Sequence, residues 1–194
     1  MLLLIMKKSI LLLAAIMLML AGCSSDEEID GLMDNQSTFR TDIYSIGYSL
    51  KNTKGDRTTT FKEGENIIFD VTIYNTIGNE IALADERDIL MGAASVFRSN
   101  GEYVGNPWQT VFYTAELRWI HIKAHDCVHW SYPWIYDEGY ASTSSISINN
   151  LSPMDPLPKG TYYSMIYGRI LKRDIDNKVS GHDDIEMRIP FTIE

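Results

Sequence analysis

Apolar and polar residues alternate with a period of two along three segments of the chain. The clearest is 66–74, where Ile67, Phe69 and Val71 share one face and polar or mixed residues occupy the other. Residues 43–50 and 185–193 alternate in the same way. This period, with many β-branched residues, is typical of strands that bury one face.

Shorter segments with strand character fill most of the remaining chain. They are 94–98, 110–113, 117–123, 127–136, 141–148 and 161–171. Turn residues such as Asn100-Gly101 separate them, and only 81–91 hints at a helical turn. About seven to nine short strands predict an all-β fold, an antiparallel Ig-like β-sandwich. A parallel sheet is not expected, because it needs long crossover connections, usually helical.

The N-terminal segment has a different pattern. Lys7 and Lys8 precede an apolar run over residues 10–20 that ends in Leu20-Ala21-Gly22-Cys23. A short basic region, a short apolar region and small residues describe a secretory signal peptide, and the run is too short to span a membrane as a helix. Its last four residues resemble the lipobox of bacterial lipoproteins. The resemblance implies that residues 1–22 are removed and that lipid on Cys23 anchors the chain to a membrane. The alternative is an ordinary cleaved signal peptide followed by a chance cysteine.

An acidic, polar stretch follows Cys23. Ser24-Ser25-Asp26-Glu27-Glu28 lacks an apolar period, which predicts a flexible tether over 23–38 before an Ig-like domain at 39–194. An acidic patch at this place resembles the surface-export signal of Bacteroidetes lipoproteins, and the alternative is a solvated spacer. The resemblance implies an outer-membrane lipoprotein that faces the periplasm or the cell surface.

Composition narrows the choice of function. The chain of 194 residues is 45% hydrophobic and 22% charged, as in globular proteins. Its net charge of −9 argues against a nucleic-acid partner, which requires clustered basic residues. Two cysteines allow at most one disulfide.

Three segments of the predicted domain also resemble a known family. Residues 61–69, 99–104 and 157–162 look like parts of bacterial Ig-like domains, and the bacterial intracellular proteinase-inhibitor family is similar there. The resemblance implies proteinase inhibition as an alternative function. The chain departs from that family where Gly105-Asn106-Pro107 precede Trp108, so no inhibitory loop is carried over. Residues 157–162 also look like a tyrosine corner, in which the Tyr162 hydroxyl bonds upstream backbone; the alternative is a plain turn.

Three histidines recur every four residues, at His121, His125 and His129. Zinc accepts such ligands, so metal binding through this segment is one alternative. Along a strand, however, residues four apart lie roughly 13 Å from one another, and residues 123–126 suggest a bend. We favour ordinary surface histidines and expect no cofactor. Cys127, between two of them, is more plausibly a buried, unreactive cysteine than a nucleophile.

Aromatic residues concentrate in one region, since all four tryptophans lie within residues 103–140. On the predicted strand 127–136, one side carries Trp130, Tyr132, Trp134 and Tyr136. If exposed, these four side chains would form a platform for a glycan or a protein ligand. If buried, they would be part of an aromatic core, which is the commoner arrangement.

Motifs of common enzymes are absent from the sequence. It has no Gly-x-Ser-x-Gly elbow, no phosphate-binding glycine loop and no Cys-x-x-Cys pair. We therefore expect no catalytic residues and no enzyme. The sequence predicts a membrane-anchored lipoprotein that acts as a non-enzymatic binding or accessory module for a glycan or protein ligand.

Overall fold

The computed structural model describes residues 35–85, 94–107, 119–135, 155–173 and 178–194. Within these ranges the chain forms eleven strands and no helix, so none of the described residues forms a helix that could cross a membrane. The strands are β1 (Gln36–Arg40), β2 (Tyr44–Lys51), β3 (Thr60–Phe61), β4 (Ile68–Asn75), β5 (Ile81–Asp85), β6 (Ser95–Arg98), β7 (Tyr103–Gly105), β8 (Ile120–Ile122), β9 (Cys127–Pro133), β10 (Gly160–Arg173) and β11 (Val179–Ile193). The all-β prediction is confirmed.

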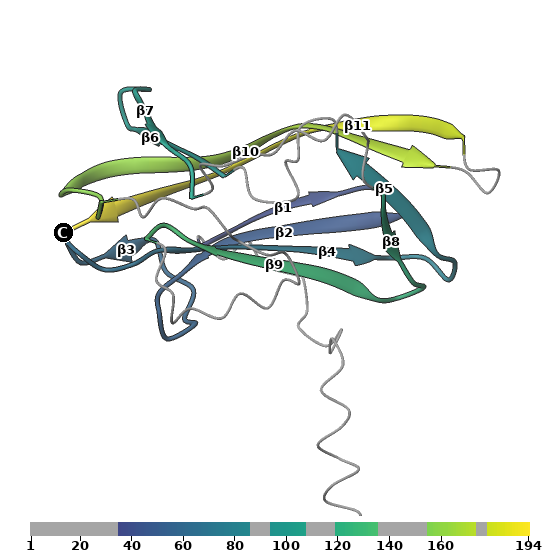
Figure 1. The fold of residues 1–194 in the computed structure, drawn as a ribbon, viewed down its shortest axis with the longest axis horizontal. Helices are drawn as coiled ribbons and strands as arrows, with labels where there is room; N and C mark the ends of the chain where they lie inside the picture. Colours follow the sequence, from purple (N-terminus) through teal and green to yellow (C-terminus); the bar gives the residue numbers. More distant parts are fainter. Residues whose placement is uncertain (1–34, 86–93, 108–118, 136–154, 174–177) are drawn as a thin grey trace, which may run out of the picture. The chain divides into compact units, whose positions relative to one another are not determined.

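The strands form two sheets (Figure 1). The four-stranded sheet has the order β1-β2-β4-β9, and all its neighbours are antiparallel. The larger sheet has the order β3-β11-β10-β5-β8, with β6 beside β10 and β7 beside β6. Its centre is the long β10–β11 hairpin, which pairs Gly160 with Ile193 at one end and Arg173 with Val179 at the other. Among the described strands, only β3 and β11 pair in parallel.

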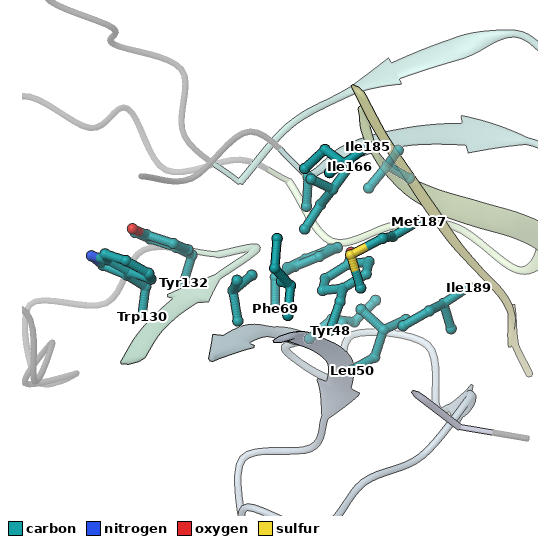
Figure 2. Packing of buried hydrophobic residues seen from close by; sticks show 14 of the residues in the cluster. Tyr48, Leu50, Phe69, Trp130, Tyr132, Ile166, Ile185, Met187 and Ile189 are labelled. Carbon is teal, nitrogen blue, oxygen red and sulfur yellow. The ribbon is translucent and has the colours of Figure 1, made fainter. Parts of the chain in front are cut away.

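One hydrophobic core lies between the sheets. Alternate residues of β2 and β4 point into it, including Tyr48, Leu50 and Phe69 (Figure 2). Alternate residues of β11, such as Met187 and Ile189, meet them from the larger sheet. Each such side chain contributes roughly 1.5–3 kcal/mol when it leaves water, so the period-two pattern is what selects the sandwich.

Two tyrosines of β2 tie the sheets together with polar contacts. The hydroxyl of Tyr48 is hydrogen-bonded to the Ser164 hydroxyl on β10. Tyr44 donates to Asp183 Oδ2 on β11 at 2.7 Å, and Lys172 donates to the other oxygen of that carboxylate. Burial raises the pKa of both tyrosines far above the usual value, so both hydroxyls remain protonated.

The predicted tyrosine corner is confirmed. The Tyr162 hydroxyl donates a 2.7 Å hydrogen bond to the carbonyl of Pro158, four residues upstream. Leu157 is buried in the core just before this turn. The corner fixes the angle at which β10 enters the larger sheet.

Several elements differ from the sequence-based expectation. Residues 81–85 form strand β5, not a helical turn, because they pair with both β8 and β10. The first strand begins at Gln36, so the end of the predicted tether belongs to the sheet. The eleven strands exceed the seven to nine expected, since short strands such as β3 and β7 carry little periodic signal. The candidate strands 110–113 and 141–148 lie outside the described residues.

Candidate functional site

Aromatic side chains of strand β9 and of the residue after it face the core. The β9 residues Trp130 and Tyr132 lie opposite Val71 and Phe69 of β4, on the inner face of the four-stranded sheet (Figure 2). Trp130 is 8% exposed, and Tyr132 and Trp134 are each 2% exposed. The indole of Trp134 donates to the carbonyl of Asp155 at 2.9 Å and its ring meets Phe69.

The proposed aromatic platform on this strand is therefore wrong for Trp130, Tyr132 and Trp134. These three side chains belong to the buried hydrophobic cluster, so no ligand can stack on them. Tyr136, the fourth candidate, lies outside the described residues, as does the lipidation candidate Cys23.

The three histidines do not converge on a metal ion. His121 lies on β8 in the larger sheet and its Nδ1 is 2.9 Å from Glu80 Oε1. His125 occupies the turn after β8, in a left-handed conformation with φ of 54°. His129 lies on β9 in the four-stranded sheet. The predicted bend is present, and it sends the two flanking strands into different sheets; no metal-ligand cluster exists among the described residues.

Cys127 is disulfide-bonded. A sulfur in a disulfide provides neither a thiolate ligand for zinc nor a nucleophile. The interpretation of Cys127 as a nucleophile therefore loses its chemical basis, and so does the view of it as an unreactive thiol.

A polar cluster centred on Asp70 lies on the outer face of the four-stranded sheet. Asp70 is only 5% exposed, yet three neighbours bind its carboxylate. Lys51 Nζ lies 2.8 Å from Oδ2, His129 Nε2 lies 2.6 Å from Oδ1, and Ser131 donates to the same Oδ1 at 3.3 Å. The serine and the histidine both contact the aspartate, so the histidine does not stand between them as a catalytic triad requires.

The electrostatics of this cluster favour the charged carboxylate. Burial by itself would raise the pKa of Asp70, but hydrogen bonds from His129 and Lys51 and the charges of those groups outweigh it and lower the pKa below 3.8. The cluster therefore holds strands β2, β4 and β9 together, and we assign it a structural role.

This assignment makes a pH-dependent prediction. The Asp70→Asn variant is expected to lose roughly 1.5–3 kcal/mol of unfolding free energy at pH 7, because hydrogen bonds to a charged group are lost. When a carboxyl group has a lower pKa in the folded state than in the unfolded state, it stabilises the fold at any pH above its unfolded-state pKa. This stabilisation is lost as the pH falls through the folded-state pKa. The difference in unfolding free energy between the wild type and Asp70→Asn should therefore be constant near neutral pH and shrink below a pH of about 3.8.

Urea denaturation between pH 7 and pH 2.5 measures this difference. Asp184→Asn is the matched control, because the Asp184 side chain is 72% exposed and pairs with Arg169. Exposed ion pairs contribute little to stability, so Asp184→Asn should lower the unfolding free energy by less than about 1 kcal/mol. An Asp70→Asn cost that does not change with pH would contradict the assignment.

A second aromatic group lies on the outer face of the larger sheet. We call it the tyrosine face; it consists of Phe97, Tyr103, Tyr163, Tyr167 and Arg188. Phe97 stacks on Tyr163 with ring centroids 5.0 Å apart, and it meets the edge of Tyr103 at 5.5 Å. The guanidinium carbon of Arg188 lies 3.5 Å from the centre of the Tyr163 ring. The contacts therefore run across β7, β6, β10 and β11 (Figure 1).

Two rings of this face are open to solvent. Tyr103 is 56% exposed and Tyr167 is 45% exposed, which makes them, with Val179, the exposed large hydrophobic residues of the described chain. Partial burial raises the pKa of Tyr103, and repulsion from Tyr167 adds to this. The hydroxyls of both exposed tyrosines can donate hydrogen bonds to a ligand.

The tyrosine face was not predicted from the sequence. Its members come from four strands, and each strand supplies only one or two of them. The available signal was the odd-numbered series Tyr163, Met165 and Tyr167 on the outward side of the segment 161–171. Only strand pairing shows that Phe97 and Tyr103 extend this series sideways.

Comparison with known proteins adds little to this geometry. No protein-family model and no curated protein matches the chain, so the resemblance to proteinase inhibitors has no further support. Among solved structures, the chain is similar to the crystal structure of the C-terminal domain of Wzt, at 10% identity and a TM-score of 0.41. The match covers 82% of this chain and 78% of that one. A likeness of this degree assigns no function.

Proposed function

We propose that the protein is a membrane-anchored, non-enzymatic binding module that holds a glycan on the tyrosine face. The observation that carries the proposal is the pair of exposed rings, Tyr103 and Tyr167, on an otherwise well-packed sheet. Exposed aromatic rings offer an apolar surface to the faces of sugar rings, and their hydroxyls offer hydrogen bonds. This proposal keeps the binding function expected from the sequence and moves its site to the other sheet.

Rigidity of the backing residues supports binding. Phe97 is held between Tyr163 and Tyr103, and Tyr163 in turn carries Arg188 on its ring. Tyrosines have few rotatable bonds, so little side-chain entropy is lost when a ligand immobilises them. A flat, preordered surface of this kind suits an extended sugar chain, and strand positions hold it more precisely than a loop would.

The Tyr103→Ala and Tyr167→Ala variants test the proposal. Each should weaken binding of the glycan by about fivefold or more, since a loss of about 1 kcal/mol corresponds to that factor. Titration calorimetry against a panel of purified oligosaccharides measures the affinity. Tyr74→Ala is the matched control, because Tyr74 lies on β4 in the four-stranded sheet, away from the tyrosine face. Unchanged affinity in both tyrosine-face variants, or binding of a protein alone, would refute the proposal.

The membrane anchor is proposed from the lipobox-like sequence ending at Cys23. Expression in bacteria with a labelled fatty acid should label the wild-type protein and leave Cys23→Ser unlabelled. The chain has two cysteines, so a lipid thioether at Cys23 and an intrachain disulfide to Cys127 exclude each other. The mass of the mature protein before and after reduction decides between them, and a mass without acyl chains would disprove the anchor.

A further inference from the structure

We propose that the glycan is acidic, and that a carboxylate of a uronic-acid residue binds Arg188. This inference rests on the proposed function, because it names the chemical class of the ligand for the same tyrosine face. It depends on the position, the exposure and the missing ion-pair partner of a single guanidinium group.

Arg188 is a cation of this sheet surface that forms no ion pair with any residue that the structure describes. On the same outer face, Arg169 is neutralised by Asp184 at 3.2 Å. Within the described ranges, Arg188 contacts no carboxylate and stacks on the ring of Tyr163.

Stacking fixes the guanidinium in a useful orientation. A guanidinium that lies flat on a ring keeps its N–H groups at its edge, where they can form the two parallel hydrogen bonds that a carboxylate accepts. Arg188 is exposed and lies opposite Met165 on β10, between the positions of Tyr163 and Tyr167 along that strand. A sugar ring on Tyr167 therefore brings a carboxylate substituent within reach of Arg188.

The surrounding charges limit the site to isolated carboxylates. Glu186 lies opposite Tyr167 on the same face and is exposed, and the whole chain carries a net charge of −9. A densely charged polyanion would be repelled by this background. A carboxylate-bearing sugar, with one charge per ring and broad apolar faces, matches one arginine between two aromatic groups.

The decisive experiment compares uronic-acid oligosaccharides with their methyl esters. Oligomers of galacturonate, mannuronate and glucuronate are titrated against the full mature protein, each beside its ester, which has the same backbone without the charge. At least one acid should bind at least tenfold more tightly than its ester. Arg188→Gln should remove that difference, and Arg188→Lys should retain only part of it, because lysine lacks the planar fork.

Arg169→Gln is the matched control, because that arginine lies on the same face but is paired with Asp184. It should leave the preference for the acid within twofold of wild type. If acids, esters and neutral oligosaccharides bound equally well, and Tyr103→Ala lost affinity for all of them, the inference would be overturned and the proposed function would stand. Binding of a sulfated oligosaccharide as tight as that of the acid would overturn the carboxylate assignment. Absence of binding to every sugar would overturn both.

Discussion

The Asn75→Asp variant is expected to lose about 3 kcal/mol or more of unfolding free energy, although it exchanges only an NH₂ group for an oxygen. Asn75 is fully buried at the end of β4. Its Nδ2 donates to the carbonyls of Asn79, Ile122 and Lys123 at 2.7, 3.0 and 2.9 Å. Aspartate would remove this donor and place a negative oxygen against the carbonyls. The Lys123 carbonyl also accepts from the Asp126 amide, but each buried group left unsatisfied costs roughly 1–3 kcal/mol.

The loss is large because Asn75 joins two turns. Its Oδ1 accepts from the amide of Ile77, and its own backbone amide donates to Asp126. Aspartate keeps the acceptor at Oδ1, so the experiment isolates the donor side. Thermal and urea denaturation measure the effect. Asn79→Asp adds the same charge at an exposed position of the same turn and should change stability by less than about 0.5 kcal/mol. Comparable stability of the two variants would show that the carboxamide does not hold the turns.

Trp134→Ala is expected to cost about 3–5 kcal/mol of unfolding free energy, the usual range for removal of a buried tryptophan. The side chain is 2% exposed, packs on Phe69 and donates to the Asp155 carbonyl. The affinity for a glycan in the folded fraction should stay within twofold of wild type, because Trp134 belongs to the core and not to the tyrosine face.

Two measurements on the same samples make this prediction specific. Chemical denaturation gives the stability, and calorimetry at a temperature where the variant is folded gives the affinity. Trp134→Phe should recover part of the packing but not the indole hydrogen bond, so it should be intermediate in stability. Loss of affinity without loss of stability in Trp134→Ala would return the binding site to strand β9.

The strand pattern was predictable where burial is one-sided. Strands β2, β4 and β11 have a continuous inner face and a mixed outer face, so the period of two appears in the sequence itself. The tyrosine corner was equally predictable, because its geometry is local and Tyr162 bonds a carbonyl only four residues away. Strand β5 was not, since five residues with the sequence IALAD suit a helix as well as a strand until β8 and β10 pair with them.

The sequence by itself determined the fold class, the turns and the residues that share a face of each strand, because these depend on neighbours within a few positions. Only the tertiary structure decided which shared faces are covered. Trp130 and Tyr132 are buried in the core of the assembled domain, whereas Tyr103 and Tyr167 remain exposed because they lie on the outer face of the larger sheet. Burial is a property of the assembled sheets, so no local pattern could separate an aromatic core from an aromatic binding face.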